Sequence, residues 1–173
     1  MTKNFFVVLV AFIGLGISSA YAQNSIAKTA KQTLMVGENN KLKIEPTTDR
    51  HNVVYNDFKI VTSEDGSLTI SFATFAERTN VALFNENGSS LKPVSEDVVS
   101  GNSEWAGNWW SENTIINNCL IILWNATVEK FVGSFTYKLD AGTYYLRIVR
   151  GQTGLSTANV SLKLVDLDGN EVK

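Results

Sequence analysis

Residues 134–148 decide the fold, and they read Ser134-Phe-Thr-Tyr-Lys-Leu-Asp-Ala-Gly-Thr-Tyr-Tyr-Leu-Arg-Ile148. On both sides of the turn residues Asp140-Ala-Gly142, apolar side chains recur with a period of two. Successive side chains of a strand point to opposite faces of a sheet, so this alternation predicts two strands that each bury one face. The predicted buried set is Phe135, Tyr137, Leu139, Tyr144, Leu146 and Ile148.

The same pattern extends outward along the chain. Residues 67–72 alternate apolar side chains with serine and threonine, and similar runs follow at 80–84 and 158–164. Asp65-Gly66 is typical of a hairpin turn that leads back to residues 58–60. No window shows the i, i+3, i+4, i+7 spacing of an amphipathic helix. The sequence therefore predicts an all-β protein, an antiparallel β-sandwich or jelly roll with about eight to nine strands.

The first 22 residues have the organisation of an export signal. Lys3 gives one positive charge, residues 5–17 are apolar, and Ala20-Tyr-Ala22 is a small-residue cleavage pattern. The apolar run is shorter than the roughly 20 residues that a membrane span needs. We expect a signal peptide over 1–22, cleaved near Ala22, and a secreted, periplasmic or cell-surface location without a mature transmembrane segment. After the signal peptide we expect a polar tail over 23–31 and then a single sandwich domain over 32–173.

Charge and cysteine content exclude several classes of protein. The chain has 15 basic and 17 acidic side chains, a net charge of −2. Removal of Lys3 with the signal leaves 14 against 17, or −3, which gives no basic surface for nucleic acid. The lone Cys119 excludes a disulfide scaffold and a cysteine-based metal site, and we expect it to be buried as a small hydrophobic side chain.

Residues 95–131 form a long insertion that carries all four tryptophans of the chain. Trp105, Trp109 and Trp110 are predicted to lie in a loop, where aromatic rings can stack on a sugar or anchor a partner. In the alternative interpretation the rings pack onto the next segment, Ile115–Trp124. The pattern of that segment predicts a strand with two apolar faces, and the tryptophan-bearing loop is the nearest part of the chain that could cover the second face. Both interpretations remain open from sequence.

Three strings together resemble a known family of secreted modules. They are residues 133–148, Gly66-Ser-Leu-Thr-Ile-Ser-Phe72 and Val81-Ala-Leu-Phe-Asn-Glu-Asn-Gly88. The chain resembles the bacterial prepeptidase C-terminal domain family over residues 32–165. The resemblance implies a β-sandwich module of secreted proteins, often appended to peptidases, and the tryptophan-bearing insertion departs from it.

No pattern of residues predicts a catalytic or metal site. His51 is the only histidine, it lies in a polar connection, and the chain has no G-x-S-x-G nucleophile elbow. Asp166-Leu-Asp-Gly-Asn-Glu171 is similar to the start of a calcium loop, but we interpret it as a hairpin-like turn. We therefore expect no enzyme activity, no metal and no cofactor.

Two functions from different classes follow from these observations. The first is a secreted, non-catalytic binding or adhesion module that recognises a glycan or cell-envelope protein through Trp105, Trp109 and Trp110. The alternative is a structural or assembly subunit of the bacterial cell envelope, with the Ile115–Trp124 strand as the subunit interface. The sequence does not fix the oligomeric state.

Overall fold

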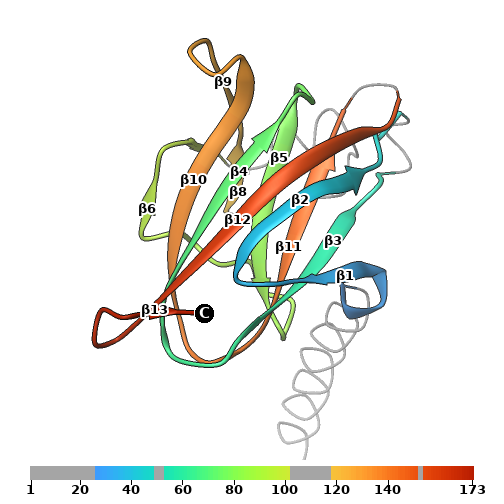
Figure 1. Cartoon of the computed structure of the whole chain (residues 1–173). Helices are drawn as coiled ribbons and strands as arrows, with labels where there is room; N and C mark the ends of the chain where they lie inside the picture. The colour runs from blue at the N-terminus through green and yellow to red at the C-terminus, as the bar shows by residue number, and fades with distance from the viewer. Residues whose placement is uncertain (1–25, 49–52, 102–117, 152–153) are drawn as a thin grey trace, which may run out of the picture.

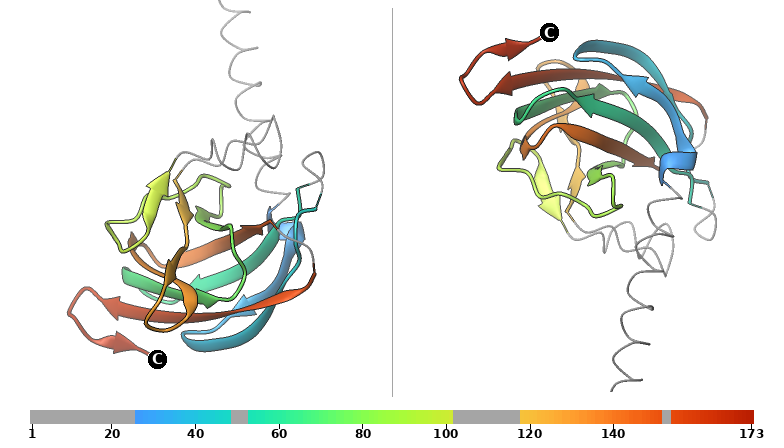
Figure 2. Two further views of the ribbon diagram at one scale, coloured as in Figure 1. Left: turned by 90° about the horizontal axis from the view of Figure 1, so that it is seen from above. Right: turned by 90° about the horizontal axis from the view of Figure 1, so that it is seen from below.

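A computed structural model describes residues 26–48, 53–101, 118–151 and 154–173. Two sheets pack face to face as a β-sandwich (Figures 1 and 2). The predicted signal peptide, His51 and the three tryptophans Trp105, Trp109 and Trp110 lie outside the described residues. No helix in the described ranges is long and apolar enough to cross a membrane.

The first sheet has six strands. Its order is β1 (Ala30–Leu34), β3 (Asn56–Thr62), β11 (Gly142–Arg150), β5 (Thr79–Asn85), β8 (Cys119–Ile121) and β7 (Val99–Gly101). Its pairs are antiparallel except for β1 with β3, which run parallel. The parallel pair differs from the fully antiparallel sheet that the sequence predicts.

The second sheet has seven strands, all paired in antiparallel fashion. Its central path is β13 (Glu171–Val172), β12 (Ser156–Asp166), β4 (Gly66–Thr74), β10 (Lys130–Leu139) and β6 (Ser95–Glu96). In addition, β2 (Gly37–Ile44) pairs with β12, and β9 (Leu123–Asn125) pairs with β10. Eight strands of the two sheets have five or more residues, and the other described strands have two or three.

The main core lies between the sheets and confirms the predicted alternation. Phe135 and Tyr137 of β10 are each 1% exposed, and Leu146 and Ile148 of β11 are fully buried. Facing residues of β4 and β12 complete the same cluster. Each strand thus contributes every second side chain, and burial of these apolar surfaces is the main stabilising term.

Several predicted hairpins are in fact arches between the two sheets. Asp65-Gly66 joins β3 of the first sheet to β4 of the second, so the predicted pairing of these neighbouring strands is wrong. The turn at Asp140 likewise joins β10 to β11 across the sandwich. The Ala141 amide of the second arch donates to the Asp65 carboxylate of the first at 2.7 Å, and this bond links the two arches. Within the second arch, the Tyr144 hydroxyl donates to the Asp140 carbonyl at 2.8 Å.

A second apolar cluster covers part of the outer face of the six-stranded sheet. Ile26 and Tyr145 belong to it and are 4% and 7% exposed. Tyr145 would be half exposed on a one-sided sheet, but this sheet is covered on both faces. Residues 26–29 form a helical turn and β1 begins at Ala30, so the tail predicted over 23–31 is part of the fold from Ile26 onward.

Candidate functional site

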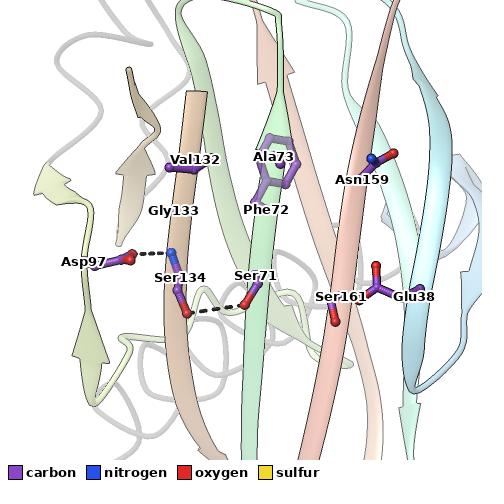
Figure 3. A pocket seen from close by; sticks show the side chains of 10 residues that line it. All are labelled: Glu38, Ser71, Phe72, Ala73, Asp97, Val132, Gly133, Ser134, Asn159 and Ser161. Carbon is purple, nitrogen blue, oxygen red and sulfur yellow. Dashed lines mark hydrogen bonds between the residues drawn. The ribbon is translucent and has the colours of Figure 1, made fainter. Parts of the chain in front are cut away.

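A shallow hollow lies on the outer face of the seven-stranded sheet (Figure 3). We call it the sheet hollow, and its volume is about 420 Å³. Side chains of β2, β4, β10 and β12 form its floor, and the segment after β6 forms one margin. Its lining residues are Glu38, Ser71, Phe72, Ala73, Asp97, Val132, Gly133, Ser134, Asn159 and Ser161.

A row of serine hydroxyls crosses the floor of the sheet hollow. Ser161 of β12 pairs with Glu38 of β2 on one side and with Ser71 of β4 on the other. Ser71 in turn pairs with Ser134 of β10, and their Oγ atoms are 3.5 Å apart. Neighbouring strands are about 4.8 Å apart, so the three serines span about 10 Å, and the row with Glu38 at its end extends for about 14 Å. Each hydroxyl can both donate and accept hydrogen bonds, so the row can bind a polyhydroxylated ligand.

Asp97 completes one margin of the hollow at a gap in the sheet. On this side of β10, β9 pairs with residues 130–132 and β6 with residues 135 and 136. The Asp97 carboxylate accepts a hydrogen bond from the Ser134 amide, and the Asp97 amide donates to the Ser134 carbonyl at 3.0 Å. Asp97 thus satisfies the backbone groups of β10 between two short edge strands.

Gly133 of β10 allows the side chains of Val98 and Ile122 to pack closely against the strand beneath this margin. A Cβ atom at this position would lie 2.2 Å from Val98 Cγ1 and 3.0 Å from Ile122 Cδ1. Val98 follows Asp97 in the chain and is 7% exposed. Only glycine allows Val98 to approach β10 this closely, so Gly133 determines where the Asp97 segment lies.

One exposed aromatic ring, Phe75, adjoins the hollow at the β9–β10 end of the sheet. Phe75 is 66% exposed and follows the lining residue Ala73 by two positions. Lys130 Nζ lies 5.2 Å from the Phe75 ring centroid. The rings of Trp124 and Phe131 meet edge to face with centroids 5.1 Å apart. Phe131 packs against the core between the sheets and Trp124 pairs with it in register, so these two rings lie on the opposite face of β10 from the serine row. Phe75 is thus the aromatic ring that can contribute to binding beside the hollow.

The segment predicted as one strand over Ile115–Trp124 is divided between the sheets in its described part. β8 belongs to the six-stranded sheet and β9 to the seven-stranded sheet. Leu120 and Ile122 pack in the main core, whereas Leu123 and Trp124 are 44% and 52% exposed. The segment is apolar on both sides because it crosses from one sheet to the other, and among residues 118–124 the exposed ones belong to β9.

The buried nucleophilic groups are unsuited to catalysis. Cys119 is buried, as expected, and desolvation raises the pKa of its thiol to about 12. Burial, and then the charge of Glu96, also raise the pKa of Tyr137. A protonated thiol or phenol that water and substrate do not reach is a poor nucleophile.

In the turn after β12, the Asp166 carboxylate accepts hydrogen bonds from groups of the same turn. Asp166 Oδ1 accepts hydrogen bonds from the amides of Asp168 and Asn170 at 2.9 and 2.7 Å. The Asn170 side chain donates to Asp166 Oδ2 at 3.1 Å. These bonds lower the pKa of Asp166 and close the hairpin to β13, which confirms the hairpin interpretation. No cluster of three or more metal-ligating side chains occurs in the described ranges.

Sequence reasoning missed a buried ion pair on the outer face of the six-stranded sheet. Arg147 Nε and Nη2 donate to the two oxygens of Asp57 at 2.7 and 2.8 Å. The guanidinium lies 3.9 Å from the Tyr55 ring centroid and 5.3 Å from that of Phe84. The side chains of Asp57 and Arg147 are 0% and 11% exposed. The only signal in sequence is two charged residues within strand patterns, which does not reveal that they pair.

The chain is similar in fold to two solved structures at low sequence identity. No protein-family model matches the chain, and no curated protein matches it significantly. A surface-associated copper-binding protein of Methylomicrobium album BG8, CorA, has 10% identity and a TM-score of 0.40 over 79% of this chain and 98% of that chain. The pre-peptidase C-terminal domain of a collagenase from Bacillus anthracis has 10% identity and a TM-score of 0.41 over 78% of this chain and 96% of that chain. The latter is a domain of the family that the sequence resembles.

Proposed function

We propose that the protein is an exported, non-catalytic binding or adhesion module that recognises a glycan on the outer face of its seven-stranded sheet. The sheet hollow carries this proposal. It combines hydroxyl, amide and carboxylate groups on an open face, and the exposed ring of Phe75 lies beside it. Polar groups of these kinds exchange hydrogen bonds with sugar hydroxyls, while aromatic rings contact the apolar faces of sugars.

The shape of the hollow favours binding over catalysis. Its floor is a sheet face rather than a deep cleft, and Glu38 and Asp97 lie at opposite margins (Figure 3). Asp97 is also committed to the backbone of β10. Glycoside hydrolysis needs two carboxyl groups that flank the same bond within about 10 Å. Such a pair is not formed by these two groups, because the three strand spacings from Glu38 to Ser134 alone amount to about 14 Å and Asp97 lies on the far side of Ser134.

Trp105, Trp109 and Trp110 remain part of this proposal on the basis of sequence. The part of the insertion that carries them connects β7 to β8, and these two strands lie at the opposite edge of the first sheet from β1. Aromatic rings on such a connection would add contact area for the same glycan or for a cell-envelope protein. The proposal assigns the protein to the periplasm, the cell surface or the medium, after cleavage near Ala22.

Affinity electrophoresis of the mature protein through gels that contain xylan, mannan, β-glucan or peptidoglycan fragments tests the proposal. We expect retardation by at least one of these polymers and at least a tenfold loss of affinity in Phe75→Ala and Ser71→Ala, with a smaller loss in Trp109→Ala. Leu167→Ala is the matched control, because Leu167 is 81% exposed and lies in the β12–β13 turn. Retardation that all variants retain, or its absence with every polymer, would refute glycan binding on this face.

A second candidate function is the envelope assembly subunit, and the exposure of β9 favours it. Leu123 and Trp124 present apolar side chains on a short strand, and Val128 in the following turn is 51% exposed. Burial of these groups between subunits would stabilise an oligomer. Light scattering at micromolar concentration tests this function: an oligomer that Trp124→Ser dissociates supports it, and a monomer excludes it.

A further inference from the structure

Three side chains meet where β1, β2 and β3 come together at one end of the sandwich. Lys31 lies on β1, Asn56 begins β3, and Glu45 directly follows β2. Lys31 Nζ donates to Asn56 Oδ1 at 2.9 Å and to Glu45 Oε1 at 2.7 Å. The Lys31 amine thus contacts both a carboxylate and a carboxamide, which come from segments 14 and 25 positions further along the chain.

The carboxamide of Asn56 is held rigidly. Asn56 is 0% exposed, and its Nδ2 donates to the carbonyls of Glu45 and Ile148 at 3.0 and 3.2 Å. Its Oδ1 accepts the Glu45 amide at 2.8 Å as well as Lys31. Hydrogen bonds to Oδ1 polarise the carbonyl and would stabilise negative charge that develops on this oxygen. The Lys31 amine that donates to Oδ1 is therefore held at the carboxamide group.

We propose that Lys31 and Asn56 join covalently after folding, through an amide bond between Lys31 Nζ and Asn56 Cγ. Lys31 is the nucleophile, Asn56 supplies the carbonyl carbon, and Glu45 is the general base. The Glu45 amide acts as the oxyanion donor. This arrangement satisfies the geometric requirements of acyl transfer: a base on the nucleophile, a donor on the carbonyl oxygen and reacting groups in contact.

The reaction needs no co-reactant. The Lys31 ammonium transfers one proton to Glu45, and the Nζ lone pair attacks Cγ to form a tetrahedral intermediate with its charge on Oδ1. A proton moves from Nζ to Nδ2, the Cγ–Nδ2 bond breaks, and ammonia leaves. Ammonia then takes the proton from Glu45 and departs as ammonium, so charge and atoms balance and no group is oxidised or reduced.

The charge state of Glu45 suits its role. The hydrogen bond from Lys31, and then its positive charge, lower the pKa of the Glu45 carboxyl. Glu45 is therefore ionised at neutral pH and can accept a proton. The Lys31 side chain is 30% exposed, so the released ammonia has a route to solvent. The resulting bond would tie the parallel pair β1–β3 together across 25 positions of the chain.

Mass spectrometry of the denatured protein tests this inference directly. We expect a proteolytic digest to contain one branched peptide that joins Lys31 to Asn56 and is lighter than its two parts by one ammonia, about 17 Da. Lys31→Arg keeps the ion pair but cannot form this bond, and Lys43→Arg is the matched control on β2. Glu45→Gln should slow formation of the linkage by about 100-fold.

The peptide rather than the intact mass decides the outcome. Cyclisation of Gln23 or succinimide formation at Asn87-Gly88 would also release ammonia. A branched peptide that is present in wild type and Lys43→Arg but absent in Lys31→Arg supports the linkage. Separate, unmodified peptides for Lys31 and Asn56 in the wild-type digest overturn it. Neither result depends on glycan binding, so this inference can fail while the proposed function stands.

Discussion

Replacement of Gly133 by alanine tests how the margin of the sheet hollow is built. The added Cβ would meet Val98 Cγ1 at 2.2 Å and Ile122 Cδ1 at 3.0 Å, both well inside van der Waals contact. Val98 and Ile122 are 7% and 2% exposed, so neither side chain can move freely into solvent. The segment that carries Asp97 and Val98 must therefore shift away from β10.

Overpacking of this kind costs about 1–3 kcal/mol. For a domain of this size, each kcal/mol lowers Tm by about 2–4 °C, so Gly133→Ala should lower Tm by about 2–12 °C. Val98→Ala removes two buried methyl groups and should cost about 1.6 kcal/mol on its own. It also removes the atom that would clash, so the double variant should be about as stable as Val98→Ala alone.

Chemical denaturation of the wild type, both single variants and the double variant measures this coupling. We expect an interaction free energy of about 1–3 kcal/mol in favour of the double variant, equal to the whole cost of Gly133→Ala. Additive losses, or a Gly133→Ala protein as stable as wild type, would refute the account of Gly133 as the close contact that positions Val98.

The remaining predictions concern buried polar and ionisable groups. Arg147→Met should cost about 3–5 kcal/mol in equilibrium unfolding, because it leaves the Asp57 carboxylate buried without its cation, and Asp57→Leu in the same chain should recover most of the loss. Asp97→Ala should destabilise the protein by about 0.5–1.5 kcal/mol, because the Ser134 amide exchanges its carboxylate acceptor for water, whereas Asp97→Asn should cost less; thermal melting compares the two. The Cys119 thiol has a pKa raised from 9.0 to about 12 in the folded state, so its contribution to stability is complete below pH 9 and lost as the pH rises toward 12. Native protein should accordingly resist a maleimide at pH 8 and react only when unfolded, and rapid labelling of the native form would contradict its burial.

The alternation of side chains made the sandwich predictable, but not which strands pair. A period of two fixes which side chains face a core, and the inward positions of β10, β11 and β12 follow it. The same pattern fits both a hairpin within one sheet and an arch between two sheets. Asp65-Gly66 and Asp140-Ala-Gly142 carry turn signals in either case, and only packing across the sandwich makes them arches.

The candidate site was less predictable because it depends on register. Ser71, Ser134 and Ser161 each occupy an ordinary outward position of a strand, and nothing near them in sequence sets them apart. They form one row only because β12, β4 and β10 pair in a particular alignment. The Asp57–Arg147 pair is hidden in the same way, since its partners are 90 positions apart in the chain. Tyr145 is buried for a related reason, because the cluster with Ile26 covers part of the outer face of its sheet, and no pattern near Tyr145 in sequence indicates this cover.

An NMR titration of isotopically labelled mature protein with the best oligosaccharide from the polymer screen tests the central claim most directly. Amide shifts report which surface the ligand contacts. The account predicts saturable shifts at Ser71, Ser134, Ser161 and Phe75, with residues of the opposite sheet such as Lys59 unchanged. Shifts confined to other surfaces, with the sheet hollow unaffected at saturation, would contradict it.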